Sequence, residues 1–229
     1  MPRIDDRRPA VMALQTFGMP DWDTLLPFVL GVLVLQLSPG PDMLLILNRG
    51  IVHGPKIAFA TIAGIVGIAG AAQISLLVLG LGSLVGSHPA AMPVLQSIGA
   101  FYLLYLGIRM MTTGLSAPEL LARSIGMRTA LREGALSSLT NPKSFLFLFV
   151  FLPQFVDPRF GPIWGQMLVL GILHKAASLV TLSAIALAAG RIGVWTRRWP
   201  MLLPLQRNVC GLLMVAISLA LAGQIHRLI

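Results

Sequence analysis

A proline–glycine–proline break and a carboxylate interrupt the first long apolar run of this chain, residues 24–47. The run is otherwise long enough to cross a bilayer, which takes about 20 residues. Pro39 and Pro41 flank Gly40 within it, and proline removes a backbone N–H and clashes with the preceding helical turn. The freed backbone groups need new partners inside the membrane, and Asp42 adds a costly charge beside them. Broken membrane helices that carry charges typically form transporter substrate sites.

The composition indicates an integral membrane protein. Hydrophobic residues make up 56% of the 229 residues and charged residues only 11%, against roughly 25% in soluble domains. The net charge is +9, but the basic residues lie in short connections between apolar runs, which favours membrane loops over a nucleic-acid surface. The single cysteine, Cys210, excludes an internal disulfide, and the sequence has neither metal-ligand spacing nor a P-loop for ATP. We therefore expect no nucleic-acid partner, no metal and no cofactor.

Six apolar runs predict an all-α membrane protein with six transmembrane helices. The predicted spans are residues 24–48, 57–82, 93–112, 136–156, 163–189 and 203–225. They divide the chain into a first half at 21–112, a cytoplasmic connection at 113–135 and a second half at 136–229. The connection is compatible both with a short amphipathic helix on the membrane and with a flexible loop. Residues 1–20 are expected to be a disordered extension or to precede the true start, for which Met19 is a candidate.

Basic residues divide unequally between the two sides of the predicted membrane. Ten of the 17 lie on the side opposite the N-terminus, five lie on the N-terminal side, and two lie within spans. The ten are Arg49, Lys56, Arg109, Arg123, Arg128, Arg132, Arg191, Arg197, Arg198 and Arg207. Because cytoplasmic loops carry the excess of lysine and arginine, we predict that both termini lie outside the cytoplasm.

A second proline interruption, in the fourth predicted span, matches the first. Aligned on proline, the pairs are Gly40 with Asn141, Pro41 with Pro142, and Asp42 with Lys143. Each half then contributes one broken helix and one charge, of opposite sign. Three spans per half also place the halves in opposite orientations, so the pattern is compatible with an inverted repeat of three plus three spans in which helices one and four are broken. Paired interruptions of this kind point to a site near the bilayer midplane.

The residues around the second interruption have two interpretations each. Lys143 either binds a substrate carboxylate or neutralises Asp42, and Asn141 either offers an amide to a ligand or satisfies backbone freed by Pro142. Asp42 itself serves transport, or is a structural partner for Lys143, or caps the half-helix that follows the first break.

Other polar residues lie deep in the predicted spans. Lys175 lies near the centre of the fifth span, and an intramembrane lysine is a functional hypothesis by default. We expect the adjacent His174 to pack against its neighbours. We expect Gln73 in the second span to bridge two helices and not to contact the substrate. Our candidates for the substrate or proton pathway are Pro39, Gly40, Pro41, Asp42, Asn141, Pro142, Lys143, Lys175 and Gln73. A stripe of small residues in the second span, Ala63, Gly67 and Ala71, permits close helix approach, within one chain or across a dimer.

The chain resembles the LysE/RhtB family of amino-acid exporters. The resemblance covers residues 21–225 and rests on SPGPDMLLILNRGIVHGPKIA from Ser38, GAFYLLYLGIRM from Gly99 and NPKSFLFLFVFLPQFVDP from Asn141. It implies a six-helix protein of the bacterial inner membrane, a homodimer, that exports amino acids or similar metabolites coupled to the proton gradient. Two positions depart from the family pattern: Gln73 stands where members often carry a histidine, and the His174–Lys175 pair is not part of the pattern.

The sequence therefore predicts a secondary transporter that exports a small amino acid or related metabolite, and not an enzyme. An intramembrane enzyme is the first alternative, but the predicted spans lack a nucleophile with its base or a pair of acids. A channel is the second, but the spans carry isolated charges in place of charged rings or continuous polar faces. Uptake of the same substrates is the third, because one alternating-access cycle runs in either direction under a suitable gradient.

The predicted orientation can be tested in the connection between the halves. A cysteine that replaces Arg123, in a Cys210→Ser background, should react with a membrane-impermeant thiol reagent only from the cytoplasm, because this connection is rich in arginine. The measurement compares labelling of intact cells with labelling of inside-out vesicles. Labelling in intact cells would reverse the orientation.

Overall fold

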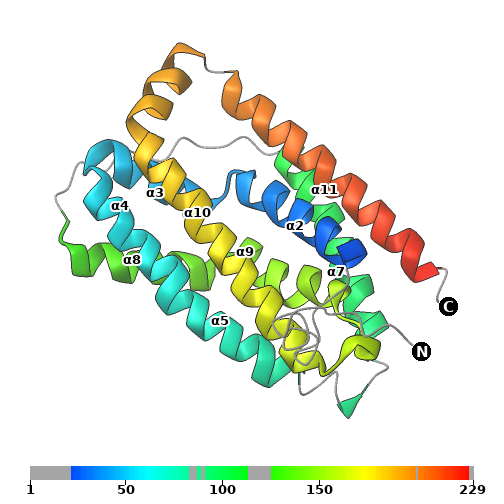
Figure 1. Cartoon of the computed structure of the whole chain (residues 1–229). Helices are drawn as coiled ribbons and strands as arrows, with labels where there is room; N and C mark the ends of the chain where they lie inside the picture. Colours follow the sequence, from blue (N-terminus) through cyan, green and yellow to red (C-terminus); the bar gives the residue numbers. More distant parts are fainter. Residues whose placement is uncertain (1–21, 83–86, 89–90, 113–124, 200, 227–229) are drawn as a thin grey trace, which may run out of the picture.

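A computed structural model of the protein describes residues 22–82, 87–88, 91–112, 125–199 and 201–226. The described chain is helical and contains no strand (Figure 1). Its first half consists of α2 (Trp22–Leu37), α3 (Pro41–Val52), α4 (Pro55–Ile62), η1 (Ala63–Ala69), α5 (Gly70–Leu76), η2 (Leu77–Gly82) and α7 (Ala91–Thr112). The second half consists of α8 (Met127–Thr140), α9 (Pro142–Leu146), η3 (Phe147–Phe151), η4 (Leu152–Phe155), η5 (Pro158–Phe160), α10 (Ile163–Arg198) and α11 (Leu202–His226). The predictions for residues 1–20, Met19 included, and for residues 113–124 lie outside the described residues.

The described helices include two to four candidate membrane spans by length and composition. Two are continuous: Pro55–Gly82, which joins α4, η1, α5 and η2, and Ile163–Trp195 of α10. Two more are bent pairs, Leu25–Leu37 with Pro41–Val52 at 53° and Met127–Thr140 with Lys143–Phe155 at 66°. Shorter apolar helices at Ser97–Thr112 and Pro204–Leu219 lie within the third and sixth predicted spans. The count of six stays a prediction.

Both helix breaks occur at the predicted prolines. Helix α2 ends at Leu37 and α3 begins at Pro41, while α8 ends at Thr140 and α9 begins at Pro142. Proline suits the first position of a helix because the missing N–H would have no partner there. At the second break Asn141 caps α9, and its side-chain oxygen accepts a hydrogen bond from the Lys143 backbone N–H at 3.0 Å.

Two helices extend nine residues beyond their predicted bounds. The helix before the second break begins at Met127, although the predicted span begins at residue 136. The first turns of this helix contain many polar residues, so a boundary drawn from hydropathy excludes them. They also carry a face of small residues, on which Ala130 and Gly134 are buried. Helix α10 likewise continues to Arg198, nine residues past the predicted end of the fifth span.

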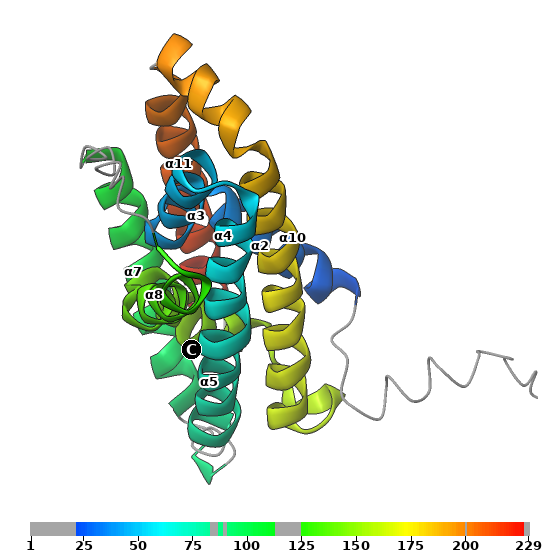
Figure 2. The same cartoon turned by 90° about the vertical axis from the view of Figure 1, so that its left-hand side faces the viewer.

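Glycines set how closely α8 crosses the continuous span that begins at α4 (Figure 1 and Figure 2). A Cβ placed on Gly64 would lie 2.0 Å from the Leu131 carbonyl oxygen, and one on Gly134 would lie 2.2 Å from the Thr61 carbonyl oxygen. The two backbones therefore touch, and this contact fixes the position of the second break. The stripe of Ala63, Gly67 and Ala71 faces outward instead, and a Cβ on Gly67 would meet nothing within 4 Å.

Two apolar clusters hold the bundle together on either side of its polar middle. The first contains Phe28 and Phe151 with rings 6.3 Å apart, together with Leu35 and Phe147. The second joins α3, α4 and η1 to α10, with Ile62 and Leu182 among its members. Members of both clusters line the same central cavity, which therefore lies between them.

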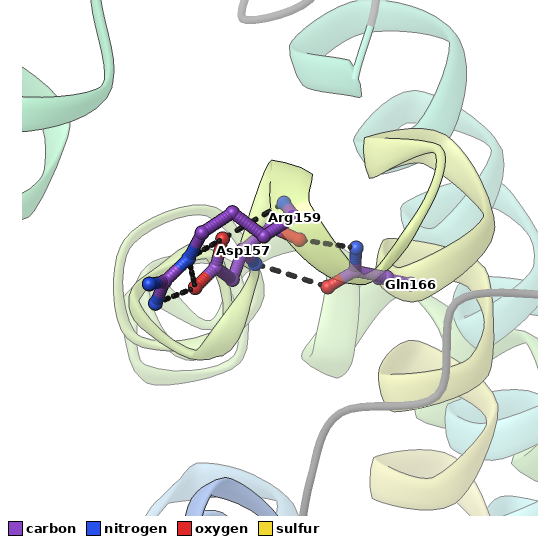
Figure 3. A network of polar contacts seen from close by, with 3 residues as sticks. All are labelled: Asp157, Arg159 and Gln166. Carbon is purple, nitrogen blue, oxygen red and sulfur yellow. Dashed lines mark hydrogen bonds and ion pairs between the residues drawn. The ribbon is translucent and has the colours of Figure 1, made fainter. Parts of the chain in front are cut away.

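A polar latch connects η5 to the start of α10 (Figure 3). The fully buried Gln166 accepts a hydrogen bond from the Asp157 N–H at 3.0 Å and donates to the Asp157 carbonyl oxygen at 2.8 Å. The hydrogen bond from the Arg159 guanidinium to the Asp157 side chain lowers the pKa of that carboxyl group. These hydrogen bonds between Gln166 and Asp157 hold the turn that leads from the second bent pair into α10.

The glycine crossing gives a stability test with a control on the same helix. Gly64→Ala should destabilise the protein by about 1–3 kcal/mol, because the new methyl group meets a carbonyl oxygen that cannot move without its helix. Gly67→Ala, three residues away in open space, should be close to neutral. The measurement is the thermal unfolding of both variants in detergent. Equal unfolding temperatures would contradict the tight crossing.

Candidate functional site

A small cavity of about 50 Å³ lies where the two broken helices meet α10. Its volume suffices for a few water molecules in this conformation. The polar residues that line it are Gln36, Ser38, Asp42, Ser138, Asn141, Lys143, Ser144, His174, Lys175 and Ser178. The structure thus brings Gly40, Asp42, Asn141, Lys143 and Lys175 of the predicted set to one cavity. The three predicted prolines form the adjacent breaks, and Gln73 lies behind Lys175.

Lys143 connects the second broken helix to the first. Its ammonium group donates a hydrogen bond of 2.6 Å to the Ser38 carbonyl oxygen, which lies just past the end of α2. Gly40 leaves room for this side chain, since a Cβ there would lie 3.3 Å from Lys143 Cδ. None of the ion pairs described in the structure joins Lys143 to Asp42. The lysine therefore satisfies freed backbone, a role that neither sequence interpretation included.

The preceding carbonyl group, that of Leu37, accepts a hydrogen bond from a side chain of α11. The Leu37 carbonyl oxygen would accept the N–H of residue 41 in a continuous helix, but Pro41 has none. The Gln206 side chain donates to this oxygen at 2.6 Å. Sequence analysis missed Gln206, because its partner is 169 residues away.

Asp42 is held by two serines that flank the second break. Ser137 of α8 donates to one carboxylate oxygen at 2.8 Å, and Ser144 of α9 donates to the other at 3.2 Å. The carboxylate thereby bridges both sides of the break opposite its own. Neither serine was predicted, although the run Ser137-Ser138 before Asn141 and Ser144 after it was a signal of a hydroxyl-rich break.

Lys175 and Gln73 form a buried chain that ends on the Ser138 carbonyl oxygen, which also accepts a hydrogen bond from the Asn141 N–H at 3.4 Å. The Lys175 ammonium donates to Gln73 Oε1 at 2.6 Å, and Gln73 Nε2 donates to the Ser138 carbonyl oxygen at 3.0 Å. Pro142 lacks the N–H that would otherwise bind this carbonyl. Lys175 is 7% exposed and Gln73 is 1% exposed. Gln73 thus bridges α10 and α8, which matches its interpretation from the sequence.

A neutral polar group closes the cavity on the side of α2. Gln36 donates to the Ser178 hydroxyl group and lies 3.5 Å from His174 Nδ1. The His174 ring also stacks on Phe147, with centroids 4.0 Å apart. His174 therefore packs, as expected, but it also has a polar neighbour. Gln36 was missed, although it is the one polar residue in the apolar stretch just before the first break.

The cavity combines one carboxylate with two ammonium groups, which are complementary to the charges of a zwitterion. The lysines can hold a carboxylate and Asp42 can hold an ammonium group. Among the described residues there is no cluster of three potential metal ligands. The one acid at the cavity also has no second acid beside it, in contrast to hydrolytic sites.

Comparisons with known proteins identify a family for this chain. The profile of the family described as LysE type translocator matches residues 33–224. An uncharacterised membrane protein of Pseudomonas aeruginosa is 32% identical to this chain, over 91% of this chain and 98% of the relative. A homoserine/homoserine lactone efflux protein of Salmonella typhimurium is 31% identical, over 87% of this chain and 96% of that protein. A leucine efflux protein of Klebsiella pneumoniae is 28% identical, over 86% and 93% of the two chains.

No solved structure matches the chain. The family profile covers both helix breaks, every residue that lines the cavity between them and most of the remaining sequence. The prediction that this protein is not an enzyme is confirmed, because translocators move their substrates without transforming them. This multi-pass membrane protein belongs to the family of LysE-type translocators.

Proposed function

We propose that this protein is a secondary transporter that exports a small amino acid, or a closely related metabolite, from the cytoplasm. One observation carries the proposal: Asp42, Lys143 and Lys175 come from three different helices and meet at one cavity between two broken helices. Relatives named as efflux proteins for homoserine and for leucine support the substrate class. Both of these amino acids present one ammonium and one carboxylate group, which complement the charges at the cavity.

Substrate binding then requires an exchange of partners. A carboxylate that approaches Lys143 competes with the Ser38 carbonyl oxygen, and an ammonium group that approaches Asp42 competes with two serine hydroxyls. The N-terminal end of α3 lies at the same place, and its partial positive charge favours a carboxylate. Because these displaced contacts join separate helices, binding loosens the connection between the broken helices. That coupling is what an alternating-access cycle needs.

We further propose that export is coupled to protons and takes place in the bacterial inner membrane with both termini outside. The inverted repeat belongs to the same proposal. Pro142 follows Pro41 by 101 residues, and Lys175 follows its partner Gln73 by 102, so the second and fifth helices contribute polar residues at equivalent depths. A homodimer completes the proposal.

The proposal is tested with purified protein in liposomes against a panel of labelled amino acids. We expect exchange of at least one neutral amino acid, with L-homoserine and L-leucine as the first probes. A pH gradient imposed across the membrane should drive accumulation of that substrate. A panel without any exchange would contradict amino-acid transport, and exchange without any response to the pH gradient would contradict proton coupling alone.

Asp42→Asn separates the two roles open to this carboxylate. If Asp42 carries the proton, the variant should lose accumulation driven by the pH gradient but keep exchange without a gradient. If it binds the substrate ammonium group, exchange should fall as well, by about tenfold or more, because a hydrogen bond to a charged group is worth about 1.5–3 kcal/mol. Gradient-driven transport equal to that of the wild type would contradict both roles.

Lys175→Met tests whether the buried charge serves transport. The variant keeps much of the side-chain length, but it removes the ammonium group from the cavity and leaves Gln73 Oε1 without its donor. We expect exchange to fall at least tenfold, from the loss of one charged hydrogen bond of about 1.5–3 kcal/mol. Lys56→Met, at an exposed position in the first turn of α4, is the matched control and should transport normally. Equal rates in the two variants would make Lys175 peripheral.

A further inference from the structure

Helices α3 and α8 face each other along two polar contacts. Asp42 accepts a hydrogen bond from Ser137 at the cavity, and Arg49 forms an ion pair with Glu133 farther along the same helices. Residues seven apart on α3, and residues four apart on α8, lie on one helix face. The four side chains therefore form a single line that starts at the cavity and runs toward the end of the bundle where α3 ends.

A groove of about 480 Å³ lies along this line, open to the outside of the bundle. Arg49 and Glu133 line one part of it, and Pro41 and Ser137 line the part beside the first break. Ser137 belongs to the groove and also donates to Asp42, which belongs to the cavity. One hydroxyl group thus separates the groove from the carboxylate of the proposed substrate site.

Arg49 lines this groove, and its guanidinium group has one unused hydrogen-bond donor. The residue is only 7% exposed, and its Nη2 atom donates to Glu133, but its buried Nε atom has no hydrogen-bond partner. Nε and Nη2 lie on the same edge of the guanidinium group, the edge that binds a carboxylate through two parallel hydrogen bonds. Glu133 uses one of these donors, and its side chain is 41% exposed, so it can leave without losing a buried position.

We propose that Arg49 is a second binding site for the substrate carboxylate, at which an amino acid waits before it passes Ser137 to Asp42. Glu133 occupies the guanidinium when no substrate is present and yields it to a carboxylate that satisfies both Nε and Nη2. The charged end of an amino acid fits Arg49, and its side chain fits the wall of Leu44, Leu45 and Leu136. This inference rests on the proposed function and adds a specificity-determining residue outside the central cavity.

The two members of the ion pair should respond in opposite directions. In counterflow of labelled L-leucine and L-homoserine, Arg49→Gln should raise KM about tenfold, the effect of one lost charged hydrogen bond, with the maximal rate within about twofold. Glu133→Gln removes the competitor and should leave KM equal or lower. Arg132→Gln, at an exposed position next to Glu133, removes one positive charge from the same region and should behave as the wild type.

A carboxylate-free competitor adds a readout that a structural ion pair would not move. L-leucinamide keeps the ammonium group and side chain of leucine but lacks its carboxylate. In the wild type it should inhibit counterflow at least tenfold more weakly than unlabelled leucine, and this ratio should fall in Arg49→Gln.

The outcomes separate this inference from the proposed function. Equal rises of KM in Arg49→Gln and Glu133→Gln, or an unchanged leucinamide ratio, would overturn the subsite and leave transport intact. The exchanged pair Arg49→Glu with Glu133→Arg keeps an ion pair if the single variant fails to fold, and full recovery of KM by this pair would also overturn the proposal. Wild-type vesicles that exchange neither amino acid would contradict the proposed function itself.

Discussion

Backbone carbonyl groups that lose their helical N–H donors inside a membrane must find other donors, and the centre of this protein is organised around that requirement. Gln206 of α11 donates a hydrogen bond to the Leu37 carbonyl oxygen, and Lys143 of α9 donates one to the Ser38 carbonyl oxygen. Gln73 of α5 accepts a hydrogen bond from Lys175 and donates one to the Ser138 carbonyl oxygen. Hydrocarbon offers no hydrogen-bond donor of its own, so each of these contacts is favoured over an open carbonyl. The two breaks thereby tie together helices that are remote in sequence.

The same requirement explains why two lysines stand beside a single aspartate. Lys143 donates to a carbonyl oxygen and Lys175 to an amide oxygen, and neither lysine is joined to Asp42 by the ion pairs that the structure describes. A buried ammonium group held only by neutral oxygens gains further from an anion, which makes the cavity receptive to a carboxylate. A bound substrate then competes with the groups that connect the broken helices for the same lysine donors. A transporter needs such competition, because a ligand shifts a conformational equilibrium only through contacts that differ between its states.

The position of α8 links this centre to the end of the bundle. Its backbone touches the continuous span at Gly64 and Gly134, and this contact leaves its hydroxyl and carboxylate groups facing α3. Asp42 and Arg49 on α3 therefore meet Ser137 and Glu133 in register. Glycine is required at the crossing because any Cβ would separate the helices and with them both polar contacts. Packing between small residues thus controls the geometry of charges about two helical turns apart.

Local properties of the sequence determined the helical membrane class, the two breaks, and the polar residues most exposed to the cost of burial. Proline at residues 39, 41 and 142 acts through its own ring and missing N–H, so the breaks follow without knowledge of the fold, and an intramembrane charge such as Asp42 or Lys175 is recognisable from hydropathy alone. The partners of these groups were decided only by the tertiary structure. Ser137 and Ser144 are ordinary polar residues until packing places them beside a carboxylate, Gln206 until packing places it beside a freed carbonyl, and Gln36 until packing places it beside Ser178 and His174. A hydrogen bond between residues some 95 to 169 positions apart leaves no local pattern, because it depends on how whole helices cross.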